Sequence, residues 1–282
     1  MQNNKTIRNE IPKITEISKV VDEGKGQKSF FFREKIDSRP GQFIMLWIPD
    51  VDEKPMAISY RNKNEFAITS QVVGKFTKSL DSLKKGDKVG IRGPYGNSFS
   101  IKGNACVVGG GVGMASVSTL IDKLKSPVII NGARSKEHLI YLKRYKKMLI
   151  ATDDGSFGKK GFTTNILEEQ LKNKNNAGKS KIFGTNSVGK IRIVYTCGPE
   201  IMMRKVLDIC NKYRVDCEAS VERYMACGFG ICGKCMVNDR IVCIDGPVFS
   251  SKQLKEMPEF GSFARLKSGK KVPLQKYHAA HI

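Results

Sequence analysis

Long apolar runs are missing from this chain of 282 residues. The best candidate for a membrane span, residues 105–120, contains four glycines and falls short of the roughly 18 apolar residues that a span needs. The opening residues carry no apolar segment of the kind found in a secretion signal. We therefore expect no membrane span and a soluble, cytoplasmic protein.

Acidic residues are scarce. The chain has 27 Asp and Glu against 49 Lys and Arg, which gives a formal net charge of +22. Such a surplus attracts nucleic acid, anionic lipid or an acidic partner, although a solvated basic surface explains it equally well. The lysines are dispersed, and neither an aromatic RNA-binding pattern nor a zinc-finger spacing occurs, so we expect no nucleic-acid partner. The acid-free stretch between Glu169 and Glu200 includes a polar, basic segment, 172–190, which predicts a surface insertion or, as the alternative, a phosphate-binding loop.

The apolar pattern changes twice along the chain. Short runs separated by turn residues fill residues 1–102 and predict a small antiparallel β-barrel. Over residues 103–218, strands alternate with helical stretches, one of them around 136–147, which predicts a parallel sheet covered by helices. Residues 219–282 form a third region that holds a cluster of cysteines. The predicted fold is multidomain: a β-barrel, an α/β domain and a small C-terminal domain.

Four of the eight cysteines lie within seventeen residues, spaced C-x4-C-x2-C-x7-C. They are Cys227, Cys232, Cys235 and Cys243. A [2Fe–2S] cluster takes two thiolates on each iron, and the first three cysteines have the plant-type ferredoxin spacing. The glycines between them let the backbone curl and direct N–H groups toward sulfur. A structural zinc site usually draws on two C-x2-C or H-x3-H pairs, whereas one C-x2-C exists here; unligated thiols are the third alternative.

A glycine-rich turn and a Cys-Gly-Pro sequence indicate a nucleotide site. Residues 109–113 follow a predicted strand and open a helix, where backbone N–H groups can meet a phosphate. The Cys-Gly-Pro at 197–199 follows a later strand, at the sheet edge where α/β proteins bind ligands. A strict G-x-G-x-x-G with a distant acid is absent, so a two-half Rossmann domain is not predicted. A plain strand-to-helix turn and a buried cysteine are the structural alternatives. The candidate nucleotide contacts are Gly110, Gly111, Gly113, Cys197, Gly198 and Pro199.

In chain order, these features resemble the ferredoxin–NADP reductase superfamily. Three motifs resemble more closely the electron transfer subunits of dihydroorotate dehydrogenase B: Glu-Arg-Tyr-Met-Ala-Cys-Gly-Phe-Gly-Ile-Cys at 222–232, Cys-Ile-Asp-Gly-Pro-Val-Phe at 243–249 and Met-Pro-Glu-Phe-Gly at 257–261. The resemblance implies FAD in the barrel, a [2Fe–2S] cluster and NAD(H) as substrate. The flavin contacts that it implies are Lys54, Pro55, Met56, Ala57, Thr69, Ser70, Gln71, Phe76 and Thr77.

The sequence departs from the family's usual pattern at three of these positions. The family usually has Arg where Lys54 stands, and lysine keeps the charge but loses the bidentate fork, so weaker FAD binding is expected. Ala57 replaces a common serine and Phe76 a common glycine. The seven-residue gap before Cys243 is shorter than in many members, and some hydrogenase and ferredoxin–NADP oxidoreductase subunits share it.

The resemblance implies an electron relay. A hydride from NADH or NADPH would reach FAD, and the cluster would pass single electrons to a partner subunit that carries FMN and interconverts dihydroorotate and orotate. In pyrimidine (UMP) biosynthesis the net flow runs the other way, to NAD+. A heterotetramer with two of each chain is expected. The chain has three histidines and no acid–base group placed for orotate chemistry, so no catalytic residue is expected in it.

Apolar residues beside the cysteines predict where the partner binds, since exposed apolar patches usually mark interfaces. These residues are Met225, Phe229, Ile231 and Met236. Covering the cluster within this chain is the alternative. Two other functions remain: a diaphorase subunit of a hydrogenase, sulfide dehydrogenase or ferredoxin–NADP oxidoreductase complex, and, from a different class, a cluster-based redox sensor or basic nucleic-acid binder.

Overall fold

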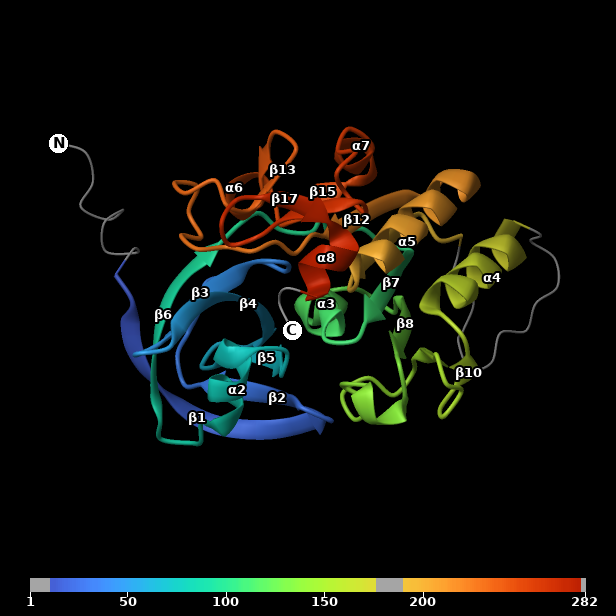
Figure 1. Ribbon diagram of the computed structural model, residues 1–282. Helices are drawn as coiled ribbons and strands as arrows, with labels where there is room; N and C mark the ends of the chain where they lie inside the picture. The colour runs from blue at the N-terminus through green and yellow to red at the C-terminus, as the bar shows by residue number, and fades with distance from the viewer. Residues whose placement is uncertain (1–10, 176–189, 280–282) are drawn as a thin grey trace.

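The structure is a computed structural model that describes residues 11–175 and 190–279. Most of the predicted insertion, as well as His281, lies outside the described residues. The described elements form a barrel, a sheet and a third region that lies across both (Figure 1).

The first part is a closed antiparallel barrel with the strand order β1-β2-β5-β4-β3-β6. Its elements are β1 (Lys13–Gly24), β2 (Gln27–Phe32), β3 (Phe43–Ile48), β4 (Asp52–Arg61), β5 (Phe66–Gln71), the helix α2 (Lys75–Ser82) and β6 (Lys88–Tyr95). Strand β3 is apolar throughout because both of its faces are covered. Ile44 and Leu46 pack inside the barrel, whereas Met45 belongs to a core shared with the sheet and the third region. The predicted antiparallel barrel is confirmed.

The second part is a seven-stranded sheet with the order β10-β9-β8-β7-β11-β12-β15. Its elements are β7 (Ala105–Gly110), α3 (Gly113–Ile121), β8 (Val128–Ala133), β9 (Leu149–Thr152), β10 (Lys159–Lys160), α4 (Thr163–Asn175), β11 (Ile193–Cys197), α5 (Glu200–Tyr213), β12 (Asp216–Ser220) and β15 (Val248–Ser250). All neighbouring strands are parallel except β12 and β15. The predicted parallel sheet with helices on its faces is confirmed.

Helix α3 joins the barrel to the sheet. All nine of its residues are buried. It packs against β7 and β11 on one side and against the barrel strand β4 on the other. Its mostly apolar side chains favour such enclosure, and the buried Ser118 hydroxyl donates to the carbonyl oxygen of Ser59 on β4.

The predicted helix around 136–147 is wrong. The segment contains one 3-10 turn, η1 (Lys136–His138), followed by further turns. Tyr141 has a φ of 64°, which a right-handed helix does not allow. The Tyr141 hydroxyl is hydrogen-bonded to Thr69 Oγ1 at 2.6 Å, and Arg144 donates to a carbonyl of β4 at 2.9 Å. Contacts with the barrel therefore determine the backbone conformation of this segment.

The third region holds the cysteines and is built from short elements. They are β13 (Met236–Val237), β14 (Arg240–Ile241), α6 (Val242–Asp245), α7 (Ser251–Lys255), β16 (Phe263–Arg265), β17 (Lys271–Pro273) and α8 (Leu274–Ala279), together with β15 of the sheet. Strand β15 pairs antiparallel with β12, from Glu218 with Ser250 to Ser220 with Val248. The region therefore completes the sheet of the second part.

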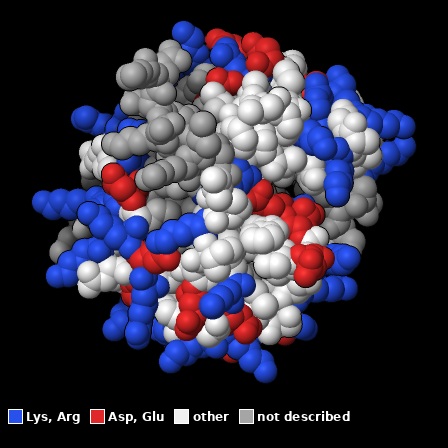
Figure 2. All heavy atoms as spheres, turned by 90° about the vertical axis from the view of Figure 1, so that its left-hand side faces the viewer, with Lys and Arg blue, Asp and Glu red and all other residues white. Residues whose placement is uncertain are grey.

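The surplus of basic residues is spread out. Figure 2 shows lysines and arginines scattered over one face of the molecule with acidic side chains among them, and they form no single stripe on that face. This agrees with the predicted dispersion. Within the described ranges, no helix combines the length and apolar character that membrane crossing requires.

Candidate functional site

The four clustered cysteines lie in two pairs. The side chain of Cys232 helps to lower the pKa of Cys227, and that of Cys243 lowers the pKa of Cys235, so the members of each pair lie close together. Across residues 11–175 and 190–279, no three His, Cys, Asp or Glu side chains gather to hold one metal ion. Two pairs of thiols fit a two-iron cluster, in which each iron takes two thiolates, better than a single tetrahedral zinc.

Backbone N–H groups surround the sulfur of Cys227. Burial opposes ionisation of this thiol, but hydrogen bonds from the backbone of Cys232, Phe229 and Ile231 outweigh it and lower the pKa of Cys227 to about 7. The same N–H groups can stabilise a thiolate ligand and tune the potential of a bound cluster. The predicted orientation of backbone N–H groups toward sulfur is thus present at this position.

The second pair shares one proton. The hydrogen bond from Cys243 lowers the pKa of Cys235 to about 6, and the same interaction raises the pKa of Cys243. A backbone hydrogen bond from Gly230 reaches the Cys243 sulfur. One thiolate therefore forms readily in this pair, and metal binding has to displace the second proton.

The glycines of the loop adopt backbone conformations that other residues resist. Gly228, Gly230 and Gly233 have φ values of 84°, 89° and 64°. A Cβ on Gly228 would lie 2.7 Å from Cγ of Met45 on β3, and one on Gly230 would lie 2.6 Å from Cγ1 of Ile244. The loop is therefore curled, as predicted, and pressed closely onto the barrel.

The predicted flavin contacts lie on β4, on β5 and at the start of α2, which packs against both strands. Lys54 is ion-paired with Asp52, and its ammonium lies 5.2 Å from the ring centre of Tyr224. The side chain of Phe76 is buried in the barrel core, so only its backbone can face a ligand. Thr77 Oγ1 accepts hydrogen bonds from the backbone of residues 73 and 74 and so shapes the first turn of α2.

Thr69 has a structural role that the sequence does not reveal. Its hydroxyl is hydrogen-bonded to those of Ser29, Ser59 and Tyr141 at 2.7, 2.9 and 2.6 Å. Tyr141 comes from the sheet side of the molecule. Thr69 therefore helps to fix the barrel against the second part, and its backbone is what remains to meet a flavin.

The structure brings the two predicted nucleotide motifs together. Strands β7 and β11 are neighbours, with Gly109 opposite Cys197. A Cβ on Gly113 would lie 2.6 Å from the backbone of Cys197 and Gly198, and one on Gly110 would lie 3.0 Å from Cδ of Pro199. The glycines therefore permit this close approach. Gly111 has a φ of 54° and an open side, as a loop that receives a ligand needs.

Glu222 is a candidate site residue that reasoning on the sequence did not assign. The Cys197 thiol donates to Glu222 Oε1 at 3.8 Å. Burial, followed by the nearby Glu222 charge, raises the pKa of Cys197. Part of the Glu222 side chain is exposed, but burial of its carboxyl group raises the pKa of Glu222. The feature of the sequence that could have identified Glu222 is its position, two residues after β12 and within the motif at 222–232.

One short segment connects the three candidate sites. Glu222 meets the nucleotide motif, Tyr224 lies beside Lys54 of the flavin strand, and Cys227 opens the cysteine loop. Between them, Arg223 is buried and forms an ion pair with Glu200, with Nη2 to Oε1 at 2.8 Å. This pair anchors the segment to α5.

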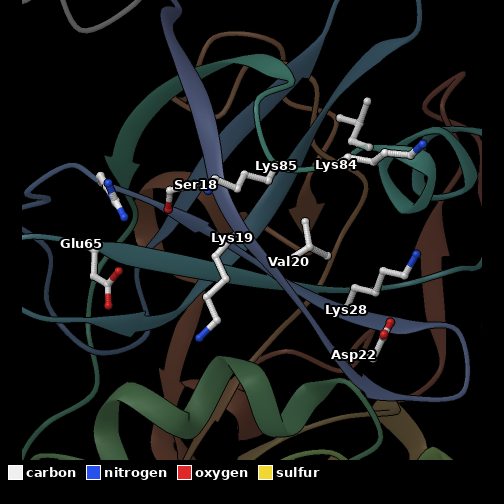
Figure 3. Close-up of a pocket in the computed structure, with 10 residues that line it drawn as sticks. Ser18, Lys19, Val20, Asp22, Lys28, Glu65, Lys84 and Lys85 are labelled. Carbon is white, nitrogen blue, oxygen red and sulfur yellow. The ribbon is translucent and has the colours of Figure 1, made fainter.

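A groove of about 630 Å³ lies elsewhere, on the outside of the barrel. Figure 3 shows Lys19 of β1, Lys28 of β2 and the adjacent Lys84 and Lys85 around it. None of the predicted site residues lines this groove. It is therefore not a continuation of the flavin, nucleotide or cysteine sites.

Comparison with known proteins agrees with this geometry. Residues 222–255 match the family model of the iron–sulfur cluster binding domain of dihydroorotate dehydrogenase B. A protein of Methanocaldococcus jannaschii, described as a probable electron transfer subunit of dihydroorotate dehydrogenase B (NAD+), is 44% identical over 273 residues, which cover 93% of this chain and 99% of the relative. The Thermoplasma acidophilum protein with the same description is 37% identical, over 92% of this chain and 97% of its own. This chain belongs to that family, the dihydroorotate dehydrogenase B electron transfer subunits.

Among solved structures, this electron transfer subunit is similar to a chain of the NADH-dependent reduced ferredoxin–NADP oxidoreductase. The TM-score is 0.72 and the identity 26%, over 88% of this chain and 93% of that one. Phthalate dioxygenase reductase shares the fold, with a TM-score of 0.55 at 16% identity, over 73% of this chain and 65% of that chain. The predicted family and fold class are thereby confirmed for this electron transfer subunit.

Proposed function

We propose that the chain is the electron transfer subunit of a dihydroorotate dehydrogenase, which relays electrons between NAD(H) and a partner catalytic subunit in pyrimidine biosynthesis. The observation that carries the proposal is the convergence of the three candidate sites on residues 222–227. FAD, bound by the nine barrel residues predicted above, supplies the step between two-electron and one-electron transfer. The four cysteines Cys227, Cys232, Cys235 and Cys243 hold the [2Fe–2S] cluster.

The residues around Cys197 prepare the nicotinamide position. The raised pKa keeps the Cys197 thiol protonated, so it would not act as a nucleophile toward a bound nicotinamide. Its hydrogen bond to Glu222 fixes the orientation of the carboxyl group. The glycine turn offers backbone N–H groups to the phosphates. These groups bind and orient NAD(H), and none of them needs to donate or accept a proton in hydride transfer.

The purified protein is expected to contain FAD and about two irons per chain, because the two thiol pairs match one [2Fe–2S] cluster. Flavin release, iron analysis and acid-labile sulfide analysis measure this. NADH should reduce a dye through the protein. Zinc without inorganic sulfide would overturn the cluster assignment, and absence of NADH–dye activity would favour a sensor.

The partner is proposed to dock beside the cysteine loop. Cys232 is exposed, and 78% of Ile231 and 53% of Ile244 are exposed beside it. Of the apolar residues predicted for this interface, Met225 is buried at 4% exposure and Phe229 packs against the barrel. We propose that Ile231 and Ile244 form the interface with an FMN-bearing catalytic subunit, in a heterotetramer with two of each chain.

Ile231→Asp is expected to weaken binding of the catalytic subunit by about tenfold or more, since burying a charge in an apolar contact costs at least 1.4 kcal/mol. NADH–dye activity should stay unchanged. Titration calorimetry with the catalytic subunit measures the affinity. Ile201→Asp is the matched control, because Ile201 on α5 is 59% exposed and lies outside the cysteine loop. Equal weakening by both variants would contradict this placement.

The second candidate is a diaphorase subunit of a ferredoxin–NADP oxidoreductase, hydrogenase or sulfide dehydrogenase complex. The structural similarity to the ferredoxin–NADP oxidoreductase chain, with a TM-score of 0.72, supports this second candidate function. Size-exclusion chromatography with the dihydroorotate dehydrogenase catalytic subunit separates the two. If the unmodified chain forms no complex, the diaphorase function replaces the pyrimidine function.

A cytoplasmic location and a division into residues 1–102, 103–218 and 219–282 are further parts of the proposal. The barrel strands and most of the sheet strands fall within the first two ranges. Strand β15 is the exception that ties the third range to the second.

A further inference from the structure

A nearly buried ion pair links the flavin strand of the barrel to the cysteine loop. Arg92 on β6 lies opposite Met45 on β3, which in turn lies opposite Pro55 on β4. The guanidinium reaches across β3 to Glu53 on β4, with Nε to Oε1 at 2.7 Å and Nη2 to Oε2 at 2.5 Å. The exposed fractions of the two side chains are 7% and 20%. Glu53 immediately precedes Lys54 and the other predicted flavin contacts on β4.

The same guanidinium also holds the cysteine loop. Its Nη2 donates to the carbonyl oxygen of Cys227 at 2.9 Å, across 135 positions of sequence. Its central carbon lies 5.5 Å from the ring centre of Phe229 and 5.8 Å from that of Tyr95. Arg92 therefore contacts both Glu53, which immediately precedes the predicted flavin contacts, and Cys227, the first predicted cluster ligand.

The loop has little freedom to compensate for loss of this contact. Gly228 fits against Met45 only because it has no side chain. The fork of arginine can serve a carboxylate and a carbonyl together, which the single ammonium of lysine does not reproduce. Removing one partner of a nearly buried pair leaves the other charge uncompensated beside the cluster loop.

We propose that Arg92 is a positioning residue for electron transfer between the flavin and the cluster: it fixes the cysteine loop against β4, and its pairing with Glu53 sets the reduction potential of the cluster. The inference rests on the proposed function. Cluster potentials depend on local charge and hydrogen bonding, so the two members of the pair act in opposite directions. Loss of the Arg92 cation disfavours the reduced cluster, and loss of the Glu53 anion favours it.

The test is an EPR-monitored redox titration of the full-length protein with FAD and cluster bound. Arg92→Gln should lower the midpoint potential of the cluster, and Glu53→Gln should raise it. The double variant, which removes both charges, should return the potential toward that of the unmodified protein. Arg33→Gln is the control, because Arg33 is exposed at the groove outside the barrel, and it should leave the potential unchanged.

Arg92→Lys separates position from charge. It should keep the cluster potential near that of the unmodified protein, yet slow electron transfer from flavin to cluster in stopped-flow measurements by about tenfold or more, the size of effect that loss of a supporting contact has at metal sites. If Arg92→Gln does not fold, the raised midpoint potential in Glu53→Gln and the slower electron transfer in Arg92→Lys still test the proposal.

Three results would overturn the inference. They are shifts of the same sign in the two single variants, no shift relative to Arg33→Gln, and an unchanged transfer rate in Arg92→Lys. An unmodified protein that lacks iron and sulfide would overturn the proposed function and this inference together. A normal cluster whose potential ignores both variants overturns the inference alone.

Discussion

Cys232→Ser is expected to abolish the [2Fe–2S] cluster while FAD stays bound. Each iron needs two thiolates, and the Cys227 pair would lose one of them. Cys232 is the exposed member of the four cysteines, so its replacement disturbs packing least. The predicted flavin contacts lie on other elements, β4, β5 and α2. The variant should still reduce ferricyanide with NADH, but should pass no electrons to the catalytic subunit.

Iron, sulfide and flavin analyses measure this result, together with the EPR signal of the reduced protein. The matched control is Cys210→Ser, which alters a buried cysteine outside the loop and should keep the cluster. Equal loss of flavin and iron in Cys232→Ser would contradict the expected independence of the two sites.

Gly113→Ala is expected to destabilise the fold by about 3 kcal/mol, as overpacking in a rigid core does. The new Cβ would lie 2.6 Å from the backbone of Cys197 and Gly198, and backbone atoms cannot rotate away as a side chain can. Helix α3 would have to move from β11, which also shifts the nucleotide site. NADH–dye activity should therefore fall by about 100-fold, the cost of a displacement near 1 Å.

Denaturant unfolding and the KM for NADH measure the two effects. Gly103→Ala is the control, because a Cβ there meets no atom within 4 Å and Gly103 has no positive φ. It should change stability by less than about 0.5 kcal/mol. A Gly113→Ala variant as stable as the control would show that α3 and β11 are not held as closely as the structure has them.

Local patterns in the sequence were sufficient for the barrel, the sheet and the cysteine loop. Apolar alternation and turn residues specify strands, and the C-x4-C-x2-C spacing limits how a loop can fold around a cluster. The contacts made across the molecule were not predictable in this way. The segment around Tyr141 has helical composition, but its bonds to Thr69 and to β4 decide its shape.

The same distinction between local motifs and contacts across the molecule applies to the residues of the candidate site. Gly113 and Cys197 were each expected at a nucleotide site because of their motifs, and the pairing of β7 with β11 brings these two motifs together. Glu222 and Arg92 were not singled out. Their positions depend on how the third region packs over the other two. The apolar periodicity of the sequence does not indicate that packing.

The antiparallel pairing of β15 with β12 has a consequence for how the chain can be divided. A β-strand that loses its neighbour exposes a row of unpaired N–H and carbonyl groups, which recruit strands from other molecules. A shortened chain that ends near residue 220 would keep the barrel and most of the sheet, but β12 would become such an unprotected edge. The segment that holds the cluster is thus also what keeps the flavin and nucleotide parts from self-association, so an evolutionary exchange of the cluster module would have to bring its own edge strand.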